Sequence, residues 1–341
     1  MRIGLIAPPW IPVPPPAYGG IEAVVDTLAL ALTQAGHEVL LAASGDSTCP
    51  VERIPDFPES DPAAVGATLP ELRHVTRAYA ALTHVDIIHD HTVVGPRYPH
   101  HPPGVPIIAT VHGPFLPEVI ELYRSVPSEV SIVAISHNQA STADAVRITR
   151  VIHHGIDPAR VPVGEGRGGY ACFLGRMNPD KGVREAILTA RRAGVPLLIA
   201  ARVQESGERE YFSTVIRPLL GADTEYLGEL NVSEKYALLG AAVALLNPIQ
   251  WNEPFGMVMI ESLATGTPVV GTTRGSAPEI IDDGRTGFLR TSVDELADAL
   301  SRAGELDRRL CRMAVEERFS SARMAADHLD LYSRQLHRVR A

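Results

Sequence analysis

The N-terminal stretch alternates between short apolar runs and one helical pattern, and this order restricts the chain to few folds. An apolar run covers residues 2–7, and a proline-rich loop follows it. Gly19-Gly20 then opens a helical pattern over residues 21–35, and the next apolar run covers residues 37–43. A strand followed by a helix and a second strand is typical of a parallel sheet. We therefore expect an α/β fold.

The same alternation continues along the chain and is interrupted once, by a glycine-rich segment at residues 164–169. Before this segment, further apolar runs predict strands at residues 85–89, 106–111, 131–135 and 150–153. The helical patterns there cover residues 69–83, 116–125 and 136–146. After the segment, the predicted strands are residues 170–175, 197–201, 224–228, 243–247, 268–272 and 287–290. The predicted helices are residues 183–193, 211–220, 233–240, 256–265 and the C-terminal end of the chain.

Two successive alternations predict two Rossmann-like domains that face each other across a cleft. We expect an N-terminal domain at residues 1–163 and a C-terminal domain at residues 164–315. Residues 316–341 are expected to form a helix that packs back on the N-terminal domain. The chain has no GxGxxG fingerprint, so a nicotinamide enzyme fits poorly.

The composition excludes several classes of protein. The formal net charge is −9, which disfavours nonspecific binding to nucleic acid or anionic lipid. No run reaches the roughly 18 apolar residues of a transmembrane helix, and prolines end the N-terminal run too early for a signal peptide. Cys49, Cys172 and Cys311 lack C-x-x-C spacing, so we expect reduced thiols and no zinc site. The sequence predicts a soluble cytoplasmic protein without stable membrane insertion.

Two acids in the segment 252–270 are the strongest candidates for ligand binding. Glu253 precedes the predicted helix 256–265, and Glu261 lies inside its apolar stretch. A buried acid costs several kcal/mol if it is unpaired, which favours a ligand role for Glu261 over that of a surface residue. The first N–H groups of the helix lack partners within it and can bind an anion or sugar hydroxyls. These groups belong to Phe255, Gly256, Met257 and Val258.

A second candidate site follows the first strand of the C-terminal domain. Arg176 and Lys181 lie on this loop between Gly175 and Gly182, which allow close approach of the backbone. The two cations can neutralise a diphosphate leaving group without a metal ion. The alternative is a solvated basic loop.

Three candidates lie at strand ends in the N-terminal domain, where parallel sheets bind ligands. His112 follows the strand 106–111 and can contact a sugar hydroxyl, chiefly to position it. Asp90 and His91 follow the strand 85–89 and can face an acceptor, or else cap a loop. Gly19-Gly20 lets backbone N–H groups approach a phosphate, although a pair of glycines is also common in simple turns.

Taken together, these residues resemble the retaining glycosyltransferases of family four, which share the two-domain GT-B architecture. The matching residues run through nearly the whole chain and are Gly19 to Glu22, Asp86 to His91, His112-Gly113, Gly155 to Asp157, Gly175-Arg176, Lys181-Gly182, Glu253 to Glu261, Pro278-Glu279 and Thr286-Gly287.

The resemblance implies a role for each candidate. Arg176 and Lys181 would bind the donor diphosphate, and Glu261 would bind the ribose. Glu253 and the backbone of residues 255–258 would hold the donor sugar, with His112 beside it. Gly19-Gly20 would lie near the β-phosphate.

Some positions depart from the family pattern. His154 stands where the family commonly has asparagine, and residues 202–205 replace a glycine-rich turn near the nucleotide base. Ala17 stands where glycogen and starch synthases carry lysine. Uridine is the expected base. The short chain, rich in Ala, Arg and Pro, resembles actinobacterial members that decorate secondary metabolites such as the orthosomycin antibiotic avilamycin.

We therefore predict a retaining, metal-independent glycosyltransferase without a cofactor. Its donor is expected to be a UDP-sugar, and its acceptor a hydroxyl group on a small molecule or glycan, with attack on the same face as the leaving group. Two alternatives stay open. One is a nucleotide-sugar epimerase or a phosphorylase on the same fold, and the other is a noncatalytic sensor of nucleotide sugars.

Overall fold

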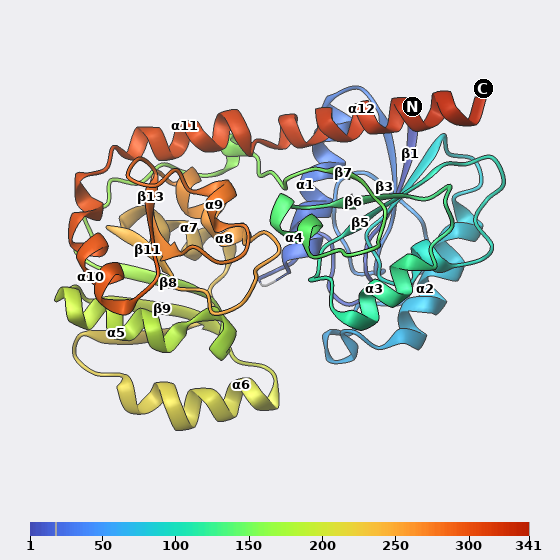
Figure 1. The fold of residues 1–341 in the computed structure, drawn as a ribbon. Coiled ribbons are helices and arrows are strands. Elements are labelled where there is room, and N and C mark those ends of the chain that lie inside the picture. The colour runs from blue at the N-terminus through green and yellow to red at the C-terminus, as the bar shows by residue number, and fades with distance from the viewer. Residues whose placement is uncertain (18, 341) are drawn as a thin grey trace. The chain divides into compact units, whose positions relative to one another are not determined.

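The computed structural model, which describes residues 1–17 and 19–340, has the expected α/β fold with two parallel sheets (Figure 1). The chain divides into two compact units. Unit 1 contains residues 1–155 and the C-terminal segment from Ser321 onward, and unit 2 contains residues 156–320. Each unit has its own sheet and its own hydrophobic core.

The sheet of unit 1 has seven parallel strands in the order β3-β2-β1-β4-β5-β6-β7. The strands are β1 (Arg2–Ile6), β2 (Glu38–Ala42), β3 (Glu52–Arg53), β4 (Ile87–Asp90), β5 (Ile107–Val111), β6 (Ser131–Ala134) and β7 (Ile148–Val151). The central strands β4, β5 and β6 are buried along their whole length. Such continuous burial is expected where helices cover both faces of a parallel sheet.

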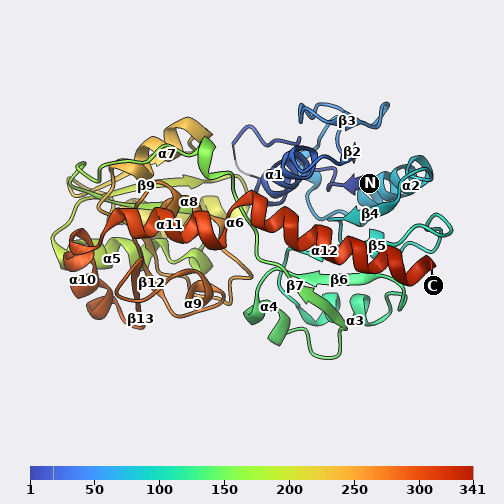
Figure 2. The same ribbon diagram turned by 90° about the horizontal axis from the view of Figure 1, so that it is seen from above.

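Helices cover the sheet of unit 1 on both faces (Figures 1 and 2). They are α1 (Gly20–Gln34), α2 (Thr68–Ala81), α3 (Pro117–Arg124), α4 (His137–Ser141) and α12 (Ser321–Arg340). On one face, Val75 and Tyr79 of α2 enter the same hydrophobic cluster as Ile88 and Ala109 of the sheet. On the other face α12 lies beside α1, so the C-terminal helix is part of unit 1.

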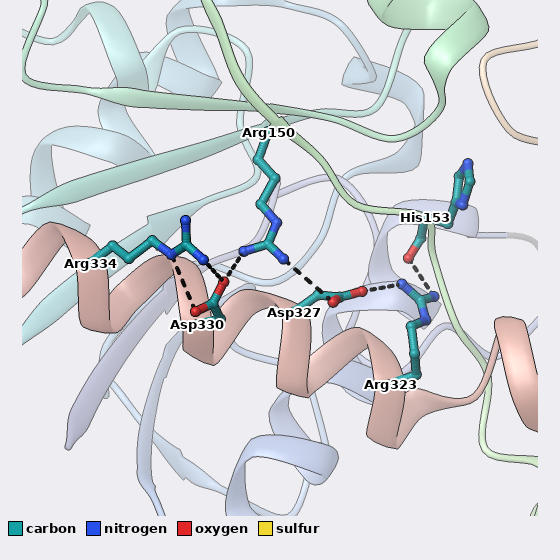
Figure 3. Close-up of polar contacts among 6 residues, drawn as sticks. All are labelled: Arg150, His153, Arg323, Asp327, Asp330 and Arg334. Atoms are coloured by element: carbon teal, nitrogen blue, oxygen red, sulfur yellow. Dashed lines mark hydrogen bonds and ion pairs between the residues drawn. The ribbon is translucent and has the colours of Figure 1, made fainter.

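Ion pairs attach α12 to the edge strand β7 (Figure 3). Arg150 of β7 contacts Asp330 and lies 3.6 Å from Asp327. Asp327 also accepts a hydrogen bond of 2.9 Å from Arg323, one turn earlier on α12. Arg334 lies on the outer side, 3.0 Å from Asp330. Arg150 thus links β7 to two acids on adjacent turns of α12, and arginines of the helix itself flank them.

The sheet of unit 2 has six parallel strands in the order β10-β9-β8-β11-β12-β13. The strands are β8 (Ala171–Arg176), β9 (Leu197–Arg202), β10 (Thr224–Gly228), β11 (Ala244–Asn247), β12 (Val269–Thr272) and β13 (Gly287–Arg290). The helices are α5 (Val183–Ala193), α6 (Ser206–Tyr211), α7 (Val232–Ala241), α8 (Met257–Ala264), α9 (Ala277–Ile280), α10 (Val293–Arg302) and α11 (Arg308–Arg318). In Figure 1, α5 and α10 pack together on one face, and α8 packs with α7 and α11 on the other.

The strand order reverses once in each sheet. In unit 1 the reversal falls between β1 and β4, and in unit 2 between β8 and β11. Loops that leave the carboxyl ends of such neighbouring strands diverge, and the space between them is where open α/β sheets bind ligands. The candidate residues lie at the ends of these strands, on the loops and helices that follow them, or, for His112, directly after the neighbouring strand β5.

Several elements differ from the sequence prediction. The helix expected at 136–146 ends at Ser141, and Asp144 takes a left-handed φ of 46°. The helix expected at 211–220 begins at Ser206 and continues as a π-helical turn over Phe212–Ile216. Neither β3 nor α10 was predicted. None of the described helices is long and apolar enough to cross a membrane.

The division between the units lies at residues 155/156 and 320/321, whereas the sequence placed it at 163/164 and 315/316. The reason is a set of hydrogen bonds to α11 and its end. Ile156 N–H donates to the carbonyl of Phe319 over 2.9 Å. Arg312 donates to the carbonyls of Pro158 and Val161 over 2.7 and 2.9 Å. These bonds join the segment after Gly155 to unit 2.

Candidate functional site

The two loops at the strand reversal of unit 2 are held tightly against each other. One contains the turn Pro179–Lys181, which Asn178 caps by accepting a hydrogen bond of 2.7 Å from Asp180 N–H. Gly182 ends this turn with a φ of +75°, and a Cβ there would overlap the carbonyl oxygen of Pro248. In addition, Gln250 N–H on the loop after β11 donates to the carbonyl of Asp180 over 2.8 Å. Lys181 is thereby placed against the loop that carries Glu253.

Lys181 and Glu253, predicted separately from the sequence, form one ion pair. The ammonium group of Lys181 hydrogen-bonds Oε2 of Glu253, and Nε1 of Trp251 donates to the same oxygen over 3.0 Å. The ammonium also lies 5.3 Å from the centre of the Trp251 ring, within reach of a cation–π attraction. The side chains of Lys181 and Glu253 are 18% and 13% exposed, so water screens the pair only weakly.

The loop from Glu253 to the start of α8 is fixed from one side by the loop before α9. Ser276 N–H donates to the carbonyl of Glu253 over 3.1 Å, and its hydroxyl donates to the carbonyl of Phe255. Gly275 has a φ of +61°, and a Cβ there would overlap the main chain of Glu253. Phe255 is buried and meets the ring of Phe319 edge-on at 6.1 Å.

The helix α8, for which the sequence predicts anion binding, begins directly after a glycine. Gly256 precedes it in the left-handed conformation, with φ of 81° and ψ of 70°, and provides no side-chain cap. Met257 and Val258, the first two residues of α8, are half-buried. The main-chain N–H groups at this end therefore meet no capping side chain from Gly256, and the dipole of the helix favours negative charge there.

Glu261 is also paired, with a residue that the sequence analysis did not select. Lys235 on α7 donates to Oε1 of Glu261 over 2.6 Å, and the side chains are 21% and 12% exposed. Asn231 caps the start of α7 and forms a capping box with Glu234, which places Lys235 on the first turn. The ammonium of Lys235 lies 5.0 Å from the ring centre of Tyr236.

A simple count could have identified Lys235. The chain has 31 basic residues, and only two of them, Lys181 and Lys235, are lysines. Both lysines contact one of the two acids of the segment 252–270. All other basic residues of the chain are arginines.

Arg176 has different partners from Lys181. Its guanidinium group lies 3.4 Å from Glu205 and 3.9 Å from Glu208 at the start of α6. Arg202 at the end of β9 also faces Glu205, over 3.6 Å. The stem of Lys181 nevertheless passes close to β8, because its Cγ lies 3.8 Å from the position of a Cβ on Gly175. Arg176 at the end of β8 and Lys181 on the turn that follows are thus each beside a carboxylate.

In unit 1 the Gly19-Gly20 pair forms the start of α1. Gly19 is the N-cap, and it provides no side-chain hydrogen bond. A Cβ on Gly19 would lie 2.6 Å from Pro15, whereas one on Gly20 would meet no atom within 4 Å. Glu22 on the first turn is buried, and burial raises its pKa to about 7.

Asp90 and His91 lie at the end of β4 and are both buried. Asp90 accepts hydrogen bonds of 2.7 Å from the Tyr79 hydroxyl and from Thr92 N–H, and burial raises its pKa to about 6. Nδ1 of His91 lies 2.8 Å from Nε2 of His112. His112 is half-buried, and burial lowers its pKa to about 3, so the ring is neutral at pH 7.

Unit 1 also contains a pocket of about 290 Å³ that the sequence did not predict. Its walls come from the loop after β1, the loop after β3 and the helix α2. The residues that line it are Pro9, Trp10, Pro58, Glu59, Asp61, Ala64, Leu69, Pro70, Arg73, His74 and Arg77. His74 is buried, and its Nε2 has no hydrogen-bond partner among the described residues.

Comparison with known proteins identifies the two halves of the chain. Residues 18–160 match the family model described as Glycosyltransferase Family 4, and residues 161–318 match the one described as Glycosyl transferases group 1. The phosphatidyl-myo-inositol mannosyltransferase of Mycolicibacterium smegmatis is 27% identical over 340 residues, which cover 89% of this chain and 83% of that protein.

Solved structures share the architecture over nearly the whole length. AviGT4, a glycosyltransferase involved in avilamycin A biosynthesis, is 26% identical and has a TM-score of 0.80, with 98% of both chains covered. HepE of Anabaena, solved in complex with UDP and glucose, is 19% identical and has a TM-score of 0.72. That match covers 98% of this chain and 99% of HepE.

Proposed function

We propose that this chain, which belongs to the group 1 and family 4 glycosyltransferases with the GT-B fold, transfers a sugar from UDP to a hydroxyl group of a small molecule. Transfer retains the anomeric configuration and uses no metal ion. The observation that carries the proposal is the position of the two Lys–Glu pairs. Both lie in unit 2 on elements around the strand reversal, and they use the only two lysines of the chain.

Groups of the protein neutralise the negative charge of the donor diphosphate. Lys181 supplies a compact ammonium charge, Arg176 a planar guanidinium group, and the start of α8 a set of main-chain N–H groups. A bound diphosphate competes with Glu253 for the ammonium of Lys181. Once released, the Glu253 carboxylate can accept hydrogen bonds from hydroxyl groups of the transferred sugar.

The second pair belongs to the nucleoside part of the donor. Glu261 accepts hydrogen bonds from both ribose hydroxyls, and Lys235 holds its carboxylate in place. The nucleoside is uridine, and HepE, which has the same fold, was solved with UDP. In unit 1, Gly19-Gly20 lies near the β-phosphate and His112 contacts the sugar.

The reaction proceeds on one face of the sugar. The bond between the anomeric carbon and the phosphate oxygen breaks with both electrons going to oxygen. The acceptor oxygen bonds to the anomeric carbon on the same face, and its proton passes to the leaving phosphate oxygen. This route needs no covalent carboxylate intermediate of the kind used by retaining glycosidases.

The acceptor binds to unit 1, with the pocket beside α2 as its principal contact. Apolar residues such as Trp10 and Leu69 suit an apolar ring, and the unpartnered Nε2 of His74 suits a donating hydroxyl. Burial lowers the pKa of His74 to about 4, so the ring is neutral at pH 7, and Nε2 accepts in the tautomer that carries its proton on Nδ1. Asp90 and His91 lie deeper on the acceptor side. An antibiotic precursor fits this combination, and AviGT4 is involved in the biosynthesis of such a compound.

A binding screen followed by a transfer assay tests the proposal. UDP-sugars should raise the melting temperature more than GDP- or ADP-sugars, since a ligand at 100 times its dissociation constant adds about 2.7 kcal/mol. With the best donor and a panel of hydroxylated aglycones, NMR of the product should show the anomeric configuration of the donor. EDTA should leave the rate unchanged.

Other outcomes of the same experiments point to the alternatives. Conversion of the nucleotide sugar to its epimer without acceptor would identify an epimerase. Absorbance of lysine-bound pyridoxal phosphate would identify a phosphorylase, and binding without any turnover would identify a sensor. Loss of activity in EDTA that Mg²⁺ restores would contradict the role of Arg176 and Lys181.

A further inference from the structure

Histidines gather in unit 1 between the ends of β4 and β5 and the helix α12. His89, His91, His154 and His328 are buried, and His112 is half-buried. Neighbouring rings lie close together. The centre-to-centre distances are 4.1 Å for His89 and His91, 5.1 Å for His91 and His112, 5.1 Å for His112 and His154, and 4.7 Å for His89 and His328.

Three of these rings form a hydrogen-bonded chain with His112 in the middle. Nε2 of His112 lies 2.8 Å from Nδ1 of His91, and Nδ1 of His112 lies 3.3 Å from Nε2 of His154. A neutral imidazole has one N–H and one acceptor nitrogen. Each contact therefore needs one donor and one acceptor, and the three tautomers must agree in direction. A change at His91 or His154 forces a change at His112.

The burial of His91, at one end of this row of rings, selects one direction for the hydrogen bonds. Nε2 of His91 is buried and has no hydrogen-bond partner among the described residues. A buried N–H group without a hydrogen-bond partner is rarer in proteins than a buried acceptor without one. The proton of His91 is therefore on Nδ1. His91 then donates to Nε2 of His112, and Nδ1–H of His112 donates to Nε2 of His154. Burial lowers the pKa of all three rings, which keeps them neutral.

The helix α12 has contacts at both ends of this row of histidine rings. Arg323 donates to the carbonyls of His153 and His154 over 2.7 and 2.9 Å, and Asp327 fixes its guanidinium group (Figure 3). At the other end, the Tyr332 hydroxyl lies 2.6 Å from Nδ1 of His89, whose ring packs against that of His91 at a tilt of 36°. Side chains of the C-terminal helix thus contact the main chain at His154 and the ring beside His91.

We propose that His91 and His154 are positioning residues that fix the tautomer and ring orientation of His112, and that Arg323 of α12 anchors this arrangement through the main chain of His154. The proposal rests on the proposed function, in which His112 contacts the transferred sugar. It gives His154, which replaces the asparagine common in this family, a defined task. It also makes the C-terminal helix a part of the catalytic arrangement.

The test measures the tautomer of His112 directly. Protein with ¹⁵N-labelled histidine is examined without ligand by long-range ¹H–¹⁵N NMR, and the His112 signals are assigned by their absence in His112→Gln. Wild-type protein should show His112 protonated on Nδ1 alone. His91→Leu and His154→Leu should each shift the His112 ring signals toward a mixture of tautomers. They should also lower kcat of glycosyl transfer about tenfold, because one buried partner is lost.

Conservative variants separate positioning from packing. Asparagine at 91 places an amide N–H₂ near the position of Nδ1, and glutamine at 154 places an amide oxygen near that of Nε2. His91→Asn and His154→Gln should therefore restore the wild-type tautomer and bring kcat within about threefold of wild type. On α12, Arg323→Met should broaden or shift the His154 and His112 signals. Arg334→Met, at a 70% exposed position of the same helix, should not.

Two results are decisive and independent. Unchanged His112 signals in both leucine variants, or tautomer averaging in the wild-type protein, would overturn the positioning proposal. Because the NMR measurement needs no activity, it stands even if no donor is ever turned over. Failure of the wild-type protein to transfer sugar would instead overturn the proposed function.

Discussion

Replacing Lys235 with methionine tests the pair that it forms with Glu261. The contact is 2.6 Å long, and the side chains are only 21% and 12% exposed. Methionine keeps most of the side-chain length but leaves the Glu261 carboxylate without its cation. Breaking a fully buried pair costs about 3–5 kcal/mol and an exposed pair about 0–1 kcal/mol, so we expect about 2 kcal/mol here. For a unit of this size, the melting temperature should fall by about 4–8 °C.

Calorimetry on Lys235→Met, Glu261→Gln and the double variant measures this effect. The double variant leaves neither charge unpaired, so its loss of stability should be smaller than the sum of the single losses by at least about 1 kcal/mol. Arg309→Met is the control, because its contact with Asp307 is on the surface, with Arg309 88% exposed. A melting temperature within about 1 °C of wild type for Lys235→Met, or strictly additive losses, would refute the reasoning.

The same variants test the ligand role of Glu261. If its carboxylate holds the ribose, Glu261→Gln should weaken UDP binding by about tenfold or more in isothermal titration calorimetry, since hydrogen bonds to a charged group are lost. An unchanged dissociation constant for UDP would remove the ribose role. The stability result for the pair would still hold.

Further predictions concern single residues. Glu253→Ala should lose transfer by several orders of magnitude and keep UDP affinity, and ordinary turnover would remove its assigned role. Lys181→Arg keeps the charge but should lower kcat/KM about tenfold, because a forked guanidinium does not replace a compact ammonium. Glu22→Gln should raise the melting temperature by several degrees at pH 8 and change it little at pH 5. Burial raises the pKa of Glu22 to about 7, so its contribution to stability is present at low pH and is lost as pH rises through 7. Gly182→Ala should destabilise unit 2 far more than Gly194→Ala, since both have positive φ but only Gly182 faces a carbonyl oxygen where Cβ would lie.

Most strands and helices could be predicted because each carries its own local signal. The helix at 183–193 and the strand at 287–290 have the bounds that the sequence predicted. The missed helix α10 also had a local signal, a capping box in which Ser292 and Glu295 bond each other's main chain. The end of unit 1 had none, because it depends on a hydrogen bond from Arg312 and one to the carbonyl of Phe319, both of which lie more than about 150 residues further along the chain.

The candidate site shows the same limit. Polar residues after the strands of a parallel sheet could be selected from the sequence, because carboxyl ends of parallel strands share one edge. Which acid faces which cation could not be selected. Lys181 and Glu253 are 72 residues apart, and Lys235 and Glu261 are 26 apart, so only the folded sheet brings them together. The histidine chain likewise has contacts with α12, which belongs to unit 1 although it comes from the far end of the sequence.

The chain has lysine at two positions and arginine at its other basic positions, and this difference has a physical explanation. Most ion pairs between elements use arginine here, as in Arg318 with Asp282, where two bonds of 2.8 and 2.9 Å reach one carboxylate. A forked guanidinium suits such fixed contacts, whereas an ammonium group on a flexible stem can exchange one oxygen ligand for another at small cost. We infer that Lys181 changes from Glu253 to the donor diphosphate when the donor binds. The donor would then release the carboxylate that holds its own sugar, so that Glu253 becomes available only when a phosphate has taken its place.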